Sequence, residues 1–213
     1  METTQWIDIT TAIENGMVHW PGDVSVIISK SSNMDDGDAA NVTDISMSAH
    51  TATHIDAQKH FVKDGKDITQ IQLDVLIGDA KVFQIHNPVS ITLEEIKNFS
   101  LSKGDRVLFK TINSTIDWAM KDFRHDYVYL ATDAAKFLLE KGVVCIGIDY
   151  LSIAGEVNGA EVHQLLLTNE IVIIEGLNLK DIDEGEYEMI CLPIKIKGAD
   201  GAPARVVIKK KVK

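Results

Sequence analysis

Residues 131–175 alternate between helical and strand-like patterns, and this alternation constrains the fold more than any other feature of the sequence. Thr132 or Asp133 can cap a helix that runs through Glu140, and Gly142 can end it in a left-handed conformation. Helices followed by buried strands are typical of α/β proteins. Two such pairs occur here, a helical pattern followed by an apolar run: 132–140 with 143–148, and 160–169 with 170–174.

Shorter segments between turn residues predict the rest of an α/β fold. The Lys-rich end of the chain (Lys209, Lys210, Lys211 and Lys213) is typical of a solvated edge strand whose charges discourage further pairing. A length of 213 residues with 45% apolar side chains is enough for one domain over residues 1–213. We expect strands over 5–13, 24–30, 42–47, 80–85, 106–110, 187–194 and 205–212, a short apolar element over 71–76, and a short helix over 92–96 capped by Thr92 with Glu95 at its third position.

The charge and the cysteines restrict the partners and the compartment. A formal net charge of -11 argues against nucleic acid or an anionic membrane as a partner, since both require a positive surface. No apolar segment approaches the length of a membrane span, so the expected partner is a small molecule. Cys145 and Cys191 lie far apart in apolar runs, as free thiols do in a reducing compartment. We expect a cytoplasmic protein.

The segment from residue 50 to residue 60 contains three of the seven histidines, His50, His54 and His60, together with Asp56. All four positions are even-numbered, so in an extended chain their side chains project to the same side. A continuous helix would instead divide them into two pairs whose centres lie about 120° apart around the axis. The extended interpretation therefore gives one site, and the helical interpretation gives two half-sites.

Imidazole nitrogens and carboxylate oxygens are ligands of zinc and manganese, so this segment indicates a metal site. The alternative is a set of unrelated polar side chains on an exposed strand. Two known metal motifs are excluded. The zincin helix requires Glu directly after its first His, where Thr51 stands, and the base deaminases require His and Glu separated by one residue.

Three other features are ambiguous from their positions alone. Trp20 lies in a turn with Pro21 and Gly22, where it can be either a core anchor or an aromatic wall for a ligand. Glu175 closes an apolar strand, where a carboxylate is unusual, but a partner in a nearby helix or turn would also explain it. The acidic loop 31–41 lacks the EF-hand spacing, and we expect it to be solvated.

These segments together resemble the cyclase family, the metal-dependent hydrolases that include bacterial kynurenine formamidase and isatin hydrolase. The family signature H-x-G-T-H-x-D-x-P-x-H is similar to residues 50–60, and its W-P-G-D turn is similar to residues 20–23, thirty residues earlier (50 − 20). Residues 147–149 are similar to its G-I-D strand end. The resemblance covers nearly the whole chain and implies an α/β fold of the swivelling β/β/α type, with a mixed sheet and packed helices.

The resemblance also implies a site with two divalent cations, zinc first and manganese second. The later His and Glu ligands of the family correspond to His163 and Glu175, which are twelve residues apart (175 − 163). His60 would be the general acid/base, and Trp20 would line the substrate pocket. The first ion would be held by His50, His54, Asp56 and Glu175, and the second by Asp56, His163 and Glu175.

Two positions depart from the family signature: Ala52 stands where the family has Gly, and Gln58 where it has Pro. Alanine costs little unless the position requires a positive φ. Without Pro, the loop before His60 is less fixed. Because every ligand position is filled, the departures bear on the substrate and the loop shape more than on the metal site.

The resemblance implies an enzyme that cleaves a C–N amide bond with a metal-activated water, in the first place an arylformamidase acting on N-formylkynurenine in tryptophan catabolism. One alternative is a hydrolase of a cyclic amide or lactone such as isatin, or a cyclase. Another is a metal-binding protein without catalysis, in which the ions only stabilise the fold. Members of the family form homo-oligomers, so we expect a dimer or tetramer.

Overall fold

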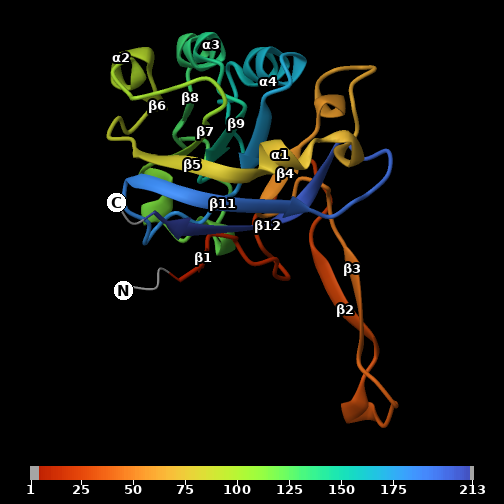
Figure 1. Ribbon diagram of the computed structural model, residues 1–213. Coiled ribbons are helices and arrows are strands. Elements are labelled where there is room, and N and C mark those ends of the chain that lie inside the picture. The colour runs from red at the N-terminus through yellow and green to blue at the C-terminus, as the bar shows by residue number, and fades with distance from the viewer. Residues whose placement is uncertain (1–4, 212–213) are drawn as a thin grey trace.

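A mixed sheet of eight strands dominates the computed structural model, which describes residues 5–211 (Figure 1). The strands are β1 (Ile7–Asp8), β4 (His54–Asp56), β5 (Ile77–Gln84), β7 (Arg106–Lys110), β9 (Cys145–Ile148), β10 (Val172–Glu175), β11 (Gly185–Pro193) and β12 (Gly201–Lys210). Their order is β1-β12-β11-β5-β7-β9-β10-β4, and a further pairing between β4 and β12 closes the sheet on itself. The strands from β5 to β10 run parallel to one another, and the remaining pairings are antiparallel.

Within the described residues, four α-helices accompany the sheet: α1 (Leu73–Leu76), α2 (Leu93–Ile96), α3 (Thr132–Lys141) and α4 (Gly159–Thr168). Figure 1 shows α2, α3 and α4 side by side along one side of the sheet. The pair β6 (Ser90–Ile91) and β8 (Tyr129–Leu130) forms a small sheet next to them. No helix among residues 5–211 is both long and apolar enough to span a membrane.

Successive side chains of the parallel strands face two different cores. Leu108 and Ile174 point into the closed sheet, where they pack against apolar side chains of β5, β11 and β12. Phe109 and Ile173 point outward and pack beneath α3 and α4. Because side chains alternate along a strand, Glu175 faces outward with Ile173, towards the helices.

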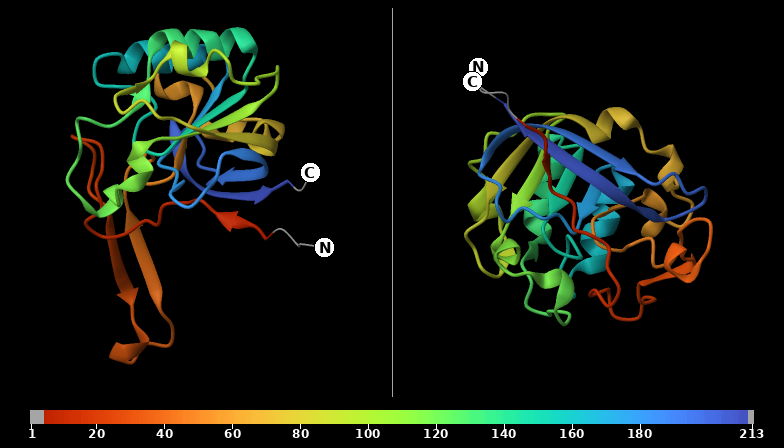
Figure 2. Two further views of the ribbon diagram at one scale, coloured as in Figure 1. Left: turned by 90° about the vertical axis from the view of Figure 1, so that its left-hand side faces the viewer. Right: turned by 90° about the horizontal axis from the view of Figure 1, so that it is seen from below.

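The hairpin of β2 (Ile27–Ser32) and β3 (Val42–Ser46), which we call the arm, extends away from the body of the protein (Figures 1 and 2). Among the described strands, β2 and β3 pair only with each other. Most of their side chains are exposed. The arm leads directly into the histidine-containing segment 50–60, since His50 lies four residues after the end of β3.

The predicted alternation of helix and strand over residues 131–175 is confirmed, with shifts at the ends. Gly142 ends α3 with a φ of 75°, as expected. The residue before the first turn is Ala131, so neither Thr132 nor Asp133 is the N-cap; both lie inside the helix. Glu170 was expected to begin a strand, but its φ of 59° places it in the turn after α4, and β10 begins at Val172.

Several predicted strands differ more. Of residues 5–13 only Ile7–Asp8 pairs as a strand, and the first strand of the arm begins at Ile27 instead of residue 24. The last strand is not a free edge, because β11 lies on one side of β12 while β1 and β4 share the other. Lys213, part of the predicted basic end, lies outside the described residues. The helix at 92–96 is confirmed, with Thr92 accepting the Glu95 N–H.

Candidate metal centre

The segment from His50 to His60 is not one extended strand. His50 lies in a turn, only His54–Asp56 forms β4, and His60 ends a short 3-10 helix over Gln58–His60. The two-residue period therefore applies to His54 and Asp56, which share the outer face of β4. The turn and the 3-10 helix, not the period, bring His50 and His60 to the same place.

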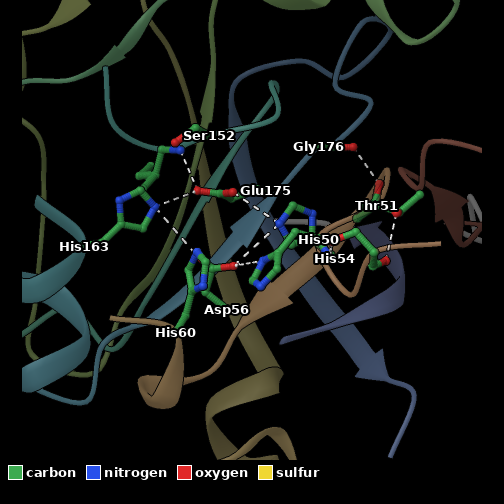
Figure 3. Close-up of polar contacts among 12 residues, drawn as sticks. His50, Thr51, His54, Asp56, His60, Ser152, His163, Glu175 and Gly176 are labelled. Atoms are coloured by element: carbon green, nitrogen blue, oxygen red, sulfur yellow. Dashed lines mark hydrogen bonds and ion pairs between the residues drawn. The ribbon is translucent and has the colours of Figure 1, made fainter. Parts of the chain in front are cut away.

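Strand pairing positions the first part of the site. β10 lies antiparallel to β4, with Glu175 directly opposite His54 and Ile173 opposite Asp56. α4 lies over this outer face and contributes His163 (Figure 3). The side chains of His54, Asp56, His163 and Glu175 are all at least 95% buried.

Each carboxylate in the cluster has one oxygen on the His54 side and the other on the His163 side. Glu175 Oε2 lies 3.2 Å from His54 Nε2, and Glu175 Oε1 lies 3.3 Å from His163 Nε2. Asp56 Oδ1 lies 3.5 Å from His54 Nε2 and 2.9 Å from His50 Nδ1, and Asp56 Oδ2 lies 3.6 Å from His163 Nε2. Both acids therefore stand between two sets of imidazoles, in the arrangement of bridging ligands.

The histidine ring orientations fit a cation. His54 Nδ1 lies 3.0 Å from the Ala52 carbonyl oxygen and His163 Nδ1 lies 2.7 Å from that of Gly159, so each Nδ1–H donates to the backbone. In the neutral tautomer, each Nε2 then directs a lone pair at carboxylate oxygens. Accordingly, His54 Nε2 and Asp56 Oδ2 are buried with no hydrogen-bond partner among residues 5–211. A divalent ion between these atoms would satisfy them, and a backbone carbonyl on the other nitrogen is the usual support for a ligating histidine.

The electrostatics of the cluster point to the same need for positive charge. Burial raises the pKa of Glu175 and so does Asp56, but His163 and His54 outweigh both and hold it below its ordinary value. Burial lowers the pKa of His50, yet the carboxylates of Asp56 and Asp200 raise it to about 9. Two buried carboxylates require positive charge nearby, and divalent cations can supply it.

The backbone around Glu175 fixes its carboxylate. Ile153 N–H donates to Glu175 Oε1 at 2.6 Å, from the loop that follows β9. Gly176 has a φ of 69° and approaches Ala52 so closely that a Cβ on it would lie 2.0 Å from the Ala52 carbonyl oxygen. Ala52 itself has a φ of 54°, so this departure from the family signature does fall at a position with positive φ. The Ala52 carbonyl oxygen also accepts the His54 Nδ1–H. The close approach of Gly176 to Ala52 therefore helps to fix the orientation of the His54 ring.

A cavity of about 450 Å³ opens beside these residues and reaches solvent. His50, His60, His163 and Glu175 line it, and so does Trp20. Trp20 is half-buried and packs edge-to-face on Phe123 at 5.1 Å, so it serves both as part of an aromatic cluster and as a wall of the cavity.

His60 stands at the mouth of the site with its side chain 28% exposed. Its ring stacks on His50 at 4.0 Å and meets the edge of Phe61 at 4.5 Å. Burial lowers the pKa of His60, and Asp56 opposes that shift without cancelling it. Atoms of His50, Asp56 and His60 lie within 4.8 Å of one another, as do atoms of His54, Asp56 and Glu175. Distance alone thus allows His60 to be a ligand as well as an acid/base.

Sequence reasoning missed two residues of the site, Asp200 and Phe61. Asp200 Oδ2 lies 3.2 Å from His50 Nε2, and Phe61 stacks on His163 at 4.5 Å. Neither matches a motif; the only signal for Phe61 is its place beside His60. Asp149, the last residue of the segment that resembles the family's G-I-D strand end, is fully buried and accepts N–H and O–H bonds from Thr111 and Ser114, so its role is structural.

The Cyclase family model matches residues 7–154, a span that includes Trp20, His50, His54, Asp56 and His60. The chain belongs to the Cyclase family. This cyclase-family chain is 36% identical over 211 residues to the kynurenine formamidase of Bacillus mycoides (strain KBAB4), a match that covers 98% of this chain and 99% of that protein.

Solved structures agree with that membership. A structure from Bacillus stearothermophilus, described as a predicted metal-dependent hydrolase, superposes on this cyclase-family chain with a TM-score of 0.86 at 35% identity, covering 98% of this chain and 100% of that one. Isatin hydrolase A from Labrenzia aggregata superposes with a TM-score of 0.84 at 22% identity, over 98% of this chain and 94% of that one. This second match shows a shared fold. The predicted α/β fold with a mixed sheet and packed helices is confirmed.

Proposed function

We propose that this protein is a metal-dependent hydrolase that cleaves the C–N bond of an aryl formamide, N-formylkynurenine or a close relative. The observation that carries the proposal is the pair of buried imidazoles, His54 and His163, whose Nε2 atoms face two buried carboxylates beneath an open cavity. The full-length likeness to a protein named kynurenine formamidase supports the substrate class. The whole chain, residues 1–213, would form the one hydrolase domain.

Two cations would be held here, zinc in the first place and manganese as the alternative, since nitrogen and oxygen ligands suit both. When bound, such ions lower the pKa of a coordinated water and polarise a carbonyl group. One ion would be held by His50, His54, Asp56 and Glu175 and the other by Asp56, His163 and Glu175, and the short distances among these side chains support both sets.

The residues of the chain would bind, orient and protonate the substrate. Trp20 and Phe61 offer aromatic surfaces in the cavity for the aryl ring of the substrate. Addition of hydroxide to the formyl carbon and cleavage of the C–N bond leave an amine that requires one proton. His60 lines the cavity, and it would take up the proton that the attacking water loses and pass it to this amine, giving the free arylamine and formic acid, which ionises to formate.

The alternative substrate is a cyclic amide or lactone. Its support is the fold shared with isatin hydrolase, and the same chemistry would open a ring instead of releasing formate. A metal site without catalysis is less favoured, because a structural site is closed to solvent, whereas the mouth residues His50 and His60 have side chains 14% and 28% exposed at a cavity.

A substrate panel on metal-stripped protein tests the proposal. The protein would be reloaded with Zn²⁺ or Mn²⁺ and assayed with N-formylkynurenine, isatin and a simple lactone. We expect metal-dependent turnover that is fastest with the formamide. Faster turnover of isatin would make a cyclic amide the substrate class in place of the formamide. The proposal of a hydrolase would be overturned if the protein bound neither ion or hydrolysed no member of the panel.

We further propose that the protein is a cytoplasmic homo-oligomer, a dimer or tetramer. The support for the compartment is that Cys145 and Cys191 are buried free thiols. The support for association is the arm, which exposes Ile27 by 57% and Ile45 by 58%. A two-stranded hairpin is marginally stable alone in water, so a second copy is the expected cover for these side chains.

A further inference from the structure

Asp200 lies at the end of the loop that precedes β12 and touches two histidines of the candidate centre at once. Its Oδ2 atom is 3.2 Å from His50 Nε2 and 3.5 Å from His60 Nδ1. The two rings that it contacts are stacked on each other at 4.0 Å. One carboxylate oxygen of Asp200 therefore contacts both rings of the stack. Asp200 lies outside the segments that match the family signature.

The backbone next to Asp200 is shaped around the same ring. Gly201 follows directly, and a Cβ there would lie 2.7 Å from His50 Cε1. The Asp200 carbonyl accepts the Ala57 N–H at 2.8 Å, which ties the loop to the end of β4. His50 therefore packs against a bare stretch of main chain, with its Nε2 directed at Asp200 and its Nδ1 directed at Asp56.

In each of the three candidate histidine ligands, one ring nitrogen contacts an oxygen atom that can hold its proton. His54 and His163 each place one ring nitrogen on a backbone carbonyl and turn the other towards the shared carboxylates. His50 has no such carbonyl contact among residues 5–211, and the oxygen on its far nitrogen is that of Asp200. A carboxylate in that position holds the proton on Nε2 and leaves Nδ1 as the atom that can bind an ion.

We infer that Asp200 is a positioning residue that serves both halves of the site, holding His50 for metal binding and His60 for proton transfer. Its Oδ2 faces His60 Nδ1 at 3.5 Å, so a proton on Nδ1 is favoured and Nε2 is left for proton transfer, as an orienting acid does for a catalytic histidine. The inference rests on the proposed hydrolase function. Asp200 also lines the cavity, and the role inferred for it acts through the two histidines.

The test compares Asp200→Ala and Asp200→Asn with the wild type in two measurements. The first is the dissociation constant of Zn²⁺ or Mn²⁺ from the metal-stripped protein, determined by competition with a chromophoric chelator and without substrate. We expect Asp200→Ala to weaken binding about 10- to 100-fold. Asn keeps one oxygen that can accept from both histidines but lacks the negative charge, so Asp200→Asn should fall between Ala and wild type.

The second measurement is a double-mutant cycle with His60→Ala at saturating metal. We expect Asp200→Ala alone to lower kcat by at least about tenfold with little change in KM, and to cause no further loss when His60 is already absent. The loss of metal affinity should persist in the His60→Ala background, because it acts through His50.

Asp64→Asn is the matched control, since it removes one carboxylate charge from the exposed turn that follows His60. It should leave both measurements unchanged. Circular dichroism of each metal-stripped variant checks that the fold is intact, and Asp200→Asn keeps the test available should the alanine variant fail to fold.

The outcomes separate the inference from the function on which it rests. Wild-type affinity and kcat in folded Asp200→Asn and Asp200→Ala would overturn the inference while the hydrolase stands. The same holds if the kcat losses from Asp200→Ala and His60→Ala simply multiply. A wild-type protein that binds no metal and hydrolyses no formamide would instead remove the proposed function.

Discussion

The floor of the candidate centre, formed by β4 and β10, and the arm, formed by β2 and β3, break the usual rule of burial in opposite ways. The floor buries two carboxylates and one histidine, and it leaves His54 Nε2 and Asp56 Oδ2 without partners among the described residues. The arm exposes large apolar side chains, including Ile27 and Ile45. Buried unpaired polar atoms and exposed apolar surface are both costly in isolation. Each region therefore points to something that the chain itself does not supply, a cation in one case and a protein surface in the other.

The largest expected effect removes the charge at the centre of the floor. Asp56 lies within 3.6 Å of ring nitrogens of His50, His54 and His163. Asp56→Ala should lose bound metal and reduce turnover to background, as measured by elemental analysis and the formamidase assay. Asp44→Ala, on an exposed position of the arm, should retain both. Full metal content in Asp56→Ala would contradict the bridging role.

Gly176 beside the candidate centre and Gly37 at the tip of the arm allow the packing of the two regions to be compared. Gly176 and Gly37 both have positive φ, 69° and 94°, but a Cβ at Gly176 would meet Ala52 backbone at 2.0 Å, whereas Gly37 at the arm tip has nothing within 4 Å. Gly176→Ala should destabilise the protein by about 3 kcal/mol or more, since strain and overpacking add. Gly37→Ala should cost only about 1 kcal/mol, the price of the backbone conformation. Denaturant unfolding measures both, and equal losses would be inconsistent with the close approach.

His60 separates metal binding from proton transfer. His60→Ala should keep metal content near that of the wild type and lower kcat about a hundredfold or more, because the leaving amine loses its proton donor. Loss of metal in this variant would make His60 a ligand, which the 4.8 Å grouping with His50 and Asp56 also permits.

The smallest expected effect on folding lies in the arm. Ile27→Ser together with Ile45→Ser should change the free energy of unfolding of the isolated subunit by no more than about 0.5 kcal/mol per site, because both side chains are already more than half exposed. The same variant should shift the assembly towards monomers in light scattering after gel filtration. An unchanged mass would show that another surface holds the copies together.

The sequence predicted the parts of the molecule that depend on local pattern. Gly142 stopped a helix where expected, and the even spacing placed His54 and Asp56 on one face of β4. The sequence also predicted that the apolar runs would be buried, as a central strand requires, and this holds for 145–148 and 171–174 but not for Glu170, which is exposed in the turn before β10.

Contacts between residues that lie far apart in the sequence could not be predicted from local patterns. His163 and Glu175 reach the cluster because β10 pairs with β4 and α4 covers that pair, and no local spacing encodes this; only the family resemblance suggested it. Asp200 arrives from a loop 150 residues away from His50. The sequence could not show whether residue 52 has a positive φ. The structure shows that it does, at the point where Ala52 lies close to Gly176.

Anomalous diffraction from crystals of the protein grown with Zn²⁺ or Mn²⁺ tests the central claim most directly. We expect ion peaks at bonding distance, about 2.0 to 2.2 Å, from His54 Nε2 and His163 Nε2, with Asp56 and Glu175 shared between them. Ions bound only elsewhere on the surface, with the His54 and His163 nitrogens still facing bare carboxylates at full metal load, would contradict the account.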